Sequence, residues 1–147
     1  MKNKLKSVLF FIVLITTITK GQASYDALIS QGINLSYSFR LEEAEALFSK
    51  AMGTAPERPE AYQYTAQIHL WAFLGSKDNS ELKIFEKWSD IAVNKAEALL
   101  KRNKEDYRIN YLLGNIYMLR AMAFSTDNSN IKAFGAGKTS YNYFKNT

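Results

Sequence analysis

Small and large apolar residues recur at fixed spacings in the first half of this chain, and these spacings restrict the folds it can adopt. The run comprises Gly32, Leu35, Ala44, Phe48, Ala51 and Pro56. It restarts in part at Tyr62 and Ala66, the second of which lies 34 residues after Gly32. A period of this length is typical of stacked helix pairs, because one pair cannot bury its apolar face alone. The sequence therefore predicts an all-α fold, an α-solenoid of about three antiparallel helical hairpins with a concave surface suited to binding.

Residues 1–23 resemble an export signal peptide and are set apart before the composition is interpreted. Three lysines in the first six residues precede an apolar stretch of 12 residues, 7–18. This stretch is shorter than the about 20 residues that a membrane-spanning helix needs. Small residues before Ser24 predict cleavage there, and an uncleaved N-terminal anchor is the alternative. We expect residues 24–147 to be exported to a bacterial periplasm or cell envelope, with no stable membrane span after cleavage.

Removal of the signal peptide changes the net charge. The whole chain has 19 basic and 14 acidic residues, a net charge of +5 with neutral histidine. Four of the lysines and no acidic residue lie in residues 1–23, which leaves 15 basic and 14 acidic side chains and a net charge of +1. A protein that binds nucleic acid needs a clustered basic face. The basic residues of 83–87 and 101–104 alternate with acidic neighbours, so nucleic acid is not an expected partner.

The chain contains no cysteine, so neither a disulfide nor a cysteine-linked lipid is expected. Residues 24–147 have the usual size of one domain. Their apolar residues recur at helical spacing, without the strict alternation that strands show. Glycine, proline and polar residues divide the pattern into six expected helices, near residues 25–37, 41–52, 59–74, 81–101, 106–124 and 130–145.

Two of the expected helices carry further predictions. Asp78 and Glu81 have the spacing of an acidic capping box, which places the start of the fourth helix near Asn79 or Ser80. Five residues of that helix predict a buried stripe: Phe85, Trp88, Ala92, Ala96 and Leu99. Four residues of the last helix predict a second, tightly packed stripe: Phe134, Gly137, Tyr141 and Phe144.

The spacings resemble those of tetratricopeptide repeat (TPR) proteins. The small, small, aromatic, small and proline positions of that family are matched by Gly32, Ala44, Phe48, Ala51 and Pro56. Leu113, Gly114 and Tyr117 repeat the first half of the pattern. Leu35 and His69 stand where the family prefers tyrosine, and the last helix lacks the Ala-x3-Phe pattern.

The resemblance implies a helical repeat domain after the signal peptide. The second repeat carries an insertion, because Ala66 and Gly114 are 48 residues apart. No polar capping helix of the kind that ends such arrays follows the third repeat. We therefore expect the natural chain to continue beyond Thr147, with this sequence as its N-terminal part. The implied repeats span about 25–58, 59–104 and 105–147.

Two motifs raise the question of catalysis or ligand binding. Gly137 opens a Gly-Lys-Thr sequence, but Lys132 stands where a phosphate-binding loop needs its first glycine. We expect a packed helix there instead. His69 is the only histidine, and the chain lacks a cysteine or a nearby Ser–Asp signature to accompany it. We therefore expect a hydrogen-bonded core histidine, and no enzyme activity, cofactor or metal site.

The family resemblance also implies that the first helix of each hairpin lines a concave groove. Eight residues are placed there: Tyr37, Gln63, Tyr64, Gln67, Trp71, Arg108, Tyr111 and Asn115. Tyrosine and tryptophan combine a flat apolar ring with a polar tip, which is common in binding hot spots. The alternative is that half of these residues pack between the hairpins.

These observations predict an exported scaffold that binds a peptide or a partner protein, such as another cell-envelope protein, in its groove. The first alternative is a cell-envelope receptor for a small ligand, a sugar or a peptide, held by Trp71 and Tyr64. The second alternative is a docking arm for a catalytic domain beyond Thr147. No residue of the chain itself indicates catalysis.

Overall fold

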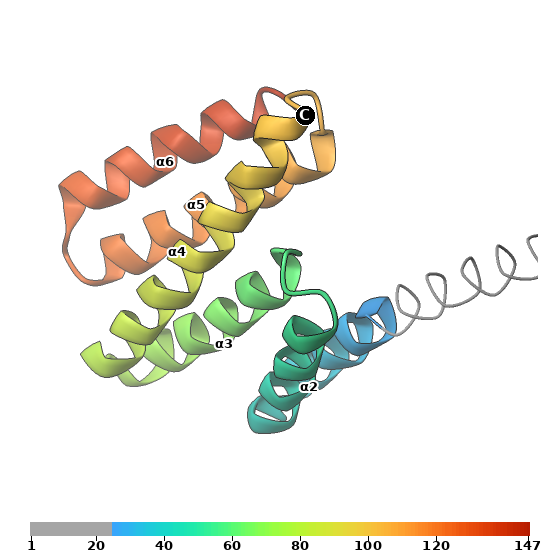
Figure 1. The fold of residues 1–147 in the computed structure, drawn as a ribbon. Helices are drawn as coiled ribbons and strands as arrows, with labels where there is room; N and C mark the ends of the chain where they lie inside the picture. Colours follow the sequence, from blue (N-terminus) through green and yellow to red (C-terminus); the bar gives the residue numbers. More distant parts are fainter. Residues whose placement is uncertain (1–24) are drawn as a thin grey trace, which may run out of the picture.

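The protein, described by a computed structural model over residues 25–147, has an all-α fold (Figure 1). Residues 25–147 contain no strand, which confirms the prediction that this part of the chain is all-α. The ends of the helices differ from the expected ones by at most two residues. The expected signal peptide, residues 1–23, lies outside the described residues. The helices comprise residues 25–37, α2 (Leu41–Thr54), α3 (Glu60–Ser76), α4 (Asn79–Arg102), α5 (Tyr107–Thr126) and α6 (Asn130–Phe144).

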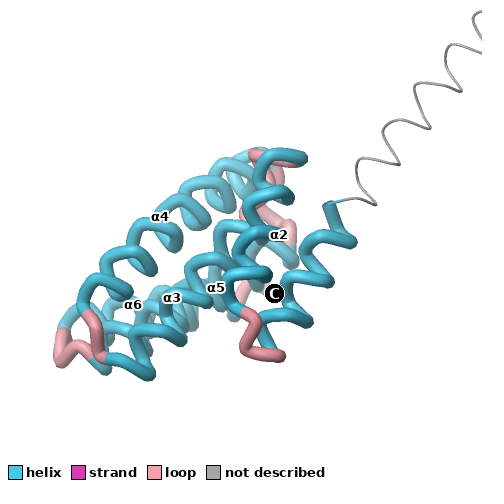
Figure 2. Tube along the Cα trace, turned by 90° about the horizontal axis from the view of Figure 1, so that it is seen from below, coloured by secondary structure: helices cyan, strands magenta, loops and turns pink. Residues whose placement is uncertain are grey.

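Helices that follow one another in the chain pack side by side. α2 contacts α3, α3 contacts α4, α4 contacts α5, and α5 contacts α6. α3 also contacts α5, so these two alternate helices are neighbours as well. Figures 1 and 2 show the helix of residues 25–37 beside α2 at one end of the molecule, and Figure 1 shows α6 at the other end. No described helix is long and apolar enough to cross a membrane.

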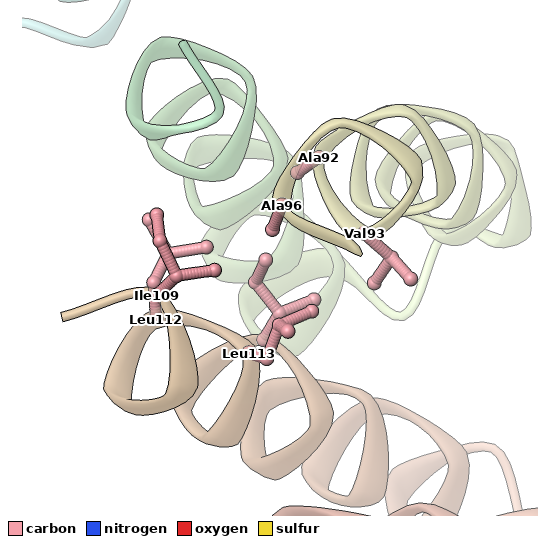
Figure 3. Close-up of a cluster of buried hydrophobic side chains, with 7 residues drawn as sticks. Ala92, Val93, Ala96, Ile109, Leu112 and Leu113 are labelled. Atoms are coloured by element: carbon pink, nitrogen blue, oxygen red, sulfur yellow. The ribbon is translucent and has the colours of Figure 1, made fainter. Parts of the chain in front are cut away.

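Three clusters of buried apolar side chains join the helices. One, around Phe48, joins the helix of residues 25–37, α2 and α3. Another, around Phe73 and Phe85, joins α3, α4 and α5. The third packs α4 against α5, and Figure 3 shows the small side chains of α4 facing larger ones of α5. Its buried members are Ala92, Val93, Ala96, Ile109, Leu112, Leu113 and Ile116.

The expected stripe on α4 belongs to these clusters. Phe85, Ala92 and Ala96 are fully buried, which confirms the prediction for them. Trp88 and Leu99 are partly buried and pack against the clusters. The spacing of apolar residues along α4 was therefore sufficient to identify the side of this helix that contributes to the core.

Acidic side chains mark where α4 and α5 begin. Asp78 Oδ1 accepts a hydrogen bond from the Ser80 backbone N–H at 2.8 Å. Asp106 caps α5 in the same way through two backbone N–H groups. Such bonds satisfy N–H groups that have no carbonyl partner in the first helical turn. Only half of the expected capping box forms, because the Glu81 carboxylate contacts His69 of α3 instead.

Glycines allow two pairs of helices to approach closely. A Cβ at Gly32 would lie 2.4 Å from the Phe48 ring, and a Cβ at Gly114 would lie 2.6 Å from the Phe144 ring. Each ring thus occupies the space that a side chain would need. The Ser140 hydroxyl also donates a hydrogen bond of 2.8 Å to the Gly114 carbonyl oxygen. The last helix lacks the Ala-x3-Phe pattern, as the sequence shows, but Ser140 and Phe144 have the same spacing, with serine in place of alanine.

The packed side of α6 differs from the expected one. Phe134 and Tyr141 are 77% and 67% exposed, so the prediction that they belong to a tightly packed stripe is wrong. Ala136 and Ser140 are buried instead, and Phe144 is half-buried. Small side chains facing α5 let the two helices pack closely, and the larger side chains on the opposite side of α6 then point outward.

The two glycine contacts provide a test of stability. Gly32→Ala and Gly114→Ala each force a methyl group against an aromatic ring, and we expect the free energy of unfolding to fall by about 1–3 kcal/mol. The loss should be larger at Gly32, because Phe48 is fully buried and Phe144 is not. Urea and thermal unfolding of both variants measure the effect.

Gly135→Ala is the matched control, because a Cβ at Gly135 would meet open space. Alanine should stabilise an exposed helix position by about 0.5–1 kcal/mol relative to glycine. Three variants of equal stability would contradict the role given to the two close contacts.

Candidate functional site

Aromatic side chains from three helices lie on one surface, and we call the four residues Tyr37, Tyr64, Trp71 and Tyr111 the aromatic face. The ring centroids of Tyr37 and Trp71 are 5.8 Å apart. Tyr37, Tyr64 and Trp71 also line one small hollow, and α5, which carries Tyr111, packs against α3. The helix of residues 25–37, α3 and α5 therefore contribute to a common surface, although they are separated in the sequence.

Tyr64 forms the centre of the aromatic face and is its most firmly held member. Its ring stacks on the ring of Phe48, with centroids 5.5 Å apart. Burial is the main cause that raises its pKa, and Tyr37, Glu60 and Tyr111 raise it further. Tyr37 and Tyr111, in contrast, are 70% and 57% exposed. The face thus combines a fixed ring with two exposed ones.

The position of these residues on α3 follows from helical geometry. Tyr64, Gln67 and Trp71 are spaced by three and four residues, which places them on one side of the helix. Ala66 and Leu70, on a different side, are buried in the core shared with α4 and α5. The aromatic side of α3 is turned away from that core, and Tyr64 packs instead against the separate cluster around Phe48.

Two methionines extend the aromatic face, and the sequence analysis did not select them. Met118 and Met122 are 44% and 46% exposed. They lie 7 and 11 residues after Tyr111, so the helical repeat puts all three on one side of α5. The spacing from Tyr111 was the signal that could have identified them. Methionine is flexible and polarizable, which suits it to irregular apolar partners.

A small hollow lies beneath the aromatic face. Its volume is about 10 Å³, which is room for about one water molecule. It is lined by Ile33, Ser36, Tyr37, Tyr64, Gln67, Ile68 and Trp71. The aromatic face is therefore a surface for contact, and the hollow beneath it does not enclose a ligand.

The remaining predicted groove residues have different surroundings. Gln67 lines the small hollow, and Asn115 is half-buried on α5. Gln63 is only 9% exposed and is not part of the accessible surface. It precedes Tyr64 by one residue and therefore points about 100° away around the helix. Arg108 is exposed and lines a separate cavity.

That separate cavity has a volume of about 400 Å³ and lies where α3 and α5 begin and α4 ends. Three arginines and two carboxylates are among the residues that line it. Arg58 forms ion pairs with Asp26 at 2.9 Å and Glu60 at 3.1 Å. Arg108 lies 3.9 Å from Asp106. Ion pairing within the protein thus offsets much of the positive charge in this cavity.

Tyr25 joins the start of the first described helix to the start of α3. Its hydroxyl donates a hydrogen bond of 3.2 Å to Glu60 Oε2 and accepts one of 3.3 Å from the Ala61 backbone N–H. The Arg58 guanidinium lies over the Tyr25 ring at 3.9 Å. Burial first, and the Glu60 charge second, raise the pKa of Tyr25. These contacts hold the N-terminal end of the helix that carries Tyr37 against the start of α3.

His69 connects three helices through its two ring nitrogens. Nδ1 lies 2.7 Å from Glu81 Oε2 of α4, and Nε2 lies 3.4 Å from Glu45 Oε1 of α2. The prediction of a hydrogen-bonded histidine is confirmed, although the side chain is partly rather than fully buried. Within residues 25–147, no group of three or more His, Cys, Asp or Glu side chains is arranged to hold a metal ion.

The Gly-Lys-Thr sequence lies inside α6. The Thr139 hydroxyl donates a hydrogen bond of 3.0 Å to the Gly135 carbonyl oxygen one turn earlier in the same helix. The segment is therefore helical, as expected, and does not form the loop that would surround a phosphate group.

Comparisons with family models, with curated proteins and with solved structures found no match to this chain.

Titration of the tyrosines tests the burial behind the aromatic face. Burial raises the pKa of Tyr25, Tyr64, Tyr117 and Tyr143. In the unfolded chain these phenols have a pKa of about 10. The stability that they contribute is therefore complete below about pH 10 and is lost as the pH rises through the raised folded-state values.

The absorbance of phenolate, followed against pH, measures this difference. The folded chain should ionise these four tyrosines at higher pH than the same chain in urea. Superimposable titration curves for the two states would show that these phenols are not protected by the fold.

Proposed function

We propose that residues 24–147 form a TPR-like solenoid of three helical hairpins that binds a peptide or a partner protein on the aromatic face. The main support is that two exposed aromatic residues, Tyr37 and Tyr111, and the half-buried Trp71 come from three separate helices to one surface. Flat rings with polar tips provide large contact areas at low cost in side-chain entropy. We also propose that the chain is exported and that its partner is a cell-envelope protein.

Repeated contacts support the solenoid arrangement. The contact of Gly32 with the Phe48 ring in the first hairpin has a counterpart in the contact of Gly114 with the Phe144 ring in the third. α3 contacts both α4 and α5, as expected when the first helices of successive hairpins lie next to each other. The same local chemistry at two places in the chain favours a repeated unit.

The surface around the aromatic face favours an apolar partner. Its residues carry uncharged side chains at every one of the positions 37, 64, 67, 71, 111, 115, 118 and 122. Rings and methionines provide apolar contact, and the amides of Gln67 and Asn115 are suited to hydrogen bonds with a peptide backbone. We therefore propose that the partner contributes an uncharged segment, either an extended peptide or the apolar side of a helix.

The small hollow favours this function over that of a receptor for a small ligand. A ligand site usually encloses most of its ligand in a cavity of roughly 300–1,000 Å³. The hollow at Trp71 and Tyr64 has a volume of about 10 Å³. A partner that lies across the rings fits this geometry better than an enclosed sugar does. We propose a binding role, without catalysis.

Peptides selected from a random display library on the full-length chain test this proposal. We expect Tyr37→Ser combined with Tyr111→Ser to lower the affinity for the selected peptides by about tenfold or more, because exposed rings at the centre of an interface dominate its affinity. Both side chains are mostly exposed, so the variant should remain folded. Fluorescence anisotropy of the labelled peptides measures the affinity.

Tyr141→Ser is the matched control, because Tyr141 is 67% exposed on α6 and is not part of the aromatic face. It should bind the peptides as tightly as the parent chain. The proposal fails if the double variant, with an unchanged melting temperature, also binds them as tightly.

A further inference from the structure

The side of α6 that faces away from the protein is unusually apolar for an exposed helix. α6 packs mainly on α5, and its Tyr143 hydroxyl also donates a hydrogen bond of 3.4 Å to Glu97 of α4. We define its outer face as Ile131, Phe134, Lys138, Tyr141 and Lys145. Ile131, Phe134 and Tyr141 are 91%, 77% and 67% exposed. Exposed apolar side chains that gather on one face, rather than occurring singly, mark sites of interaction.

The spacing of this outer face matches a helical partner. Its residues follow one another at intervals of three, four, three and four. This average of about 3.5 residues is the period at which one helix keeps a continuous seam against another. The period alone does not identify the partner, but a glycine and the charges on this face restrict its chemistry.

Gly135 lies on the same face, between Ile131 and Lys138. Glycine within a helix costs about 1 kcal/mol relative to alanine. At Gly32 and Gly114 this cost is offset because an aromatic ring packs where a side chain would be. A Cβ at Gly135, in contrast, would meet no atom within 4 Å. The packing of the described residues therefore provides no reason for glycine at this position. The close approach of another backbone would provide one.

The charges near the outer face have a single sign. Residues 130–147 contain three lysines and no acidic residue. The Lys132 ammonium lies over the Phe124 ring at 5.3 Å, which leaves Lys138 and Lys145 on the outer face. Asp127, the nearest preceding acidic residue, accepts a hydrogen bond from the Ser129 hydroxyl at 2.8 Å. A partner that places carboxylates near these lysines would be attracted.

The same charges argue against three occupants within residues 1–147. In an antiparallel pair of α6 helices from two copies, Lys138 of one copy would lie near Lys138 of the other. Residues 1–23 carry four lysines and no acidic residue, so they are repelled as well. α2 has three acidic residues, but it contributes no large exposed apolar side chain. The occupant must therefore combine an apolar seam with acidic flanks.

We propose that the outer face of α6 binds an amphipathic helix of a partner protein. Its apolar seam packs on Ile131, Phe134 and Tyr141, its backbone passes close to Gly135, and its carboxylates lie near Lys138 and Lys145. This site is separate from the aromatic face and does not depend on the function proposed for that face.

A synthetic amphipathic helix with leucine along its seam and glutamate along both flanks is the probe, and the full-length chain is the receptor. Fluorescence anisotropy should show saturable binding that weakens as salt is added. A matched peptide with lysine in place of every glutamate should bind at least about tenfold more weakly, because its charges repel those of α6. Equal binding of the two peptides would overturn the proposal.

Three variants of the chain locate the site. Phe134→Ser and Lys138→Glu should each lower the affinity for the acidic peptide by about tenfold. Gly135→Ala should raise the melting temperature of the free chain and yet lower its affinity for the peptide. Damage to the fold cannot produce this combination. Tyr37→Ser with Tyr111→Ser should leave this affinity unchanged.

Two other results would also overturn the proposal. One is unchanged affinity in Phe134→Ser and Lys138→Glu, which would place the peptide elsewhere. The other is failure to bind the acidic peptide together with binding to vesicles that contain anionic lipid, but not to zwitterionic vesicles. That result would assign the basic apolar face to a membrane surface instead.

Discussion

The contact between a glycine and a phenylalanine ring is the interaction on which the aromatic face depends. Because Gly32 has no side chain, the Phe48 ring lies against the first described helix, and Tyr64 stacks on that ring with centroids 5.5 Å apart. The pair of α5 and α6 repeats the arrangement, since a glycine of α5 admits the Phe144 ring and Tyr111 packs on it at 5.7 Å. In both pairs, the ring that fills the space above glycine also supports a tyrosine of the candidate binding surface. Helix packing and site geometry are therefore set by the same contact.

Charge is distributed unevenly from one end of the molecule to the other. Residues 25–76 have three basic and six acidic side chains, a net charge of −3, whereas residues 107–147 have five basic and one acidic, a net charge of +4. The aromatic face carries no charge, and the outer face of α6 carries lysines. The two surfaces thus differ in the chemistry that each would recognise, which is consistent with two different partners on one small scaffold.

The helices were predictable from the sequence because local signals determine them: glycine and proline breaks, acidic N-caps and apolar spacing along α4. The sides that the helices present to one another were less predictable. On α6 the apolar spacing suggested that Phe134 and Tyr141 are packed. Instead, the Ser140 hydroxyl donates a hydrogen bond to a carbonyl oxygen of α5, so the side of α6 that carries Ser140 faces α5 and the two aromatic side chains are exposed. In α3, the buried Gln63 and Tyr64 of the aromatic face are adjacent in the sequence but lie on different sides of the helix. Such choices depend on contacts between distant segments, and spacing within one helix does not contain that information.

Methionine methyl NMR tests the proposed binding surface most directly. The chain has four methionines, of which Met118 and Met122 lie beside the aromatic face, whereas Met52 packs against the buried cluster around Phe48. With a peptide selected on the full-length chain, the account predicts that the methyl signals of Met118 and Met122 shift in proportion to saturation while that of Met52 stays in place. Saturated binding that leaves the Met118 and Met122 signals unchanged would contradict the assignment of the aromatic face as the binding surface.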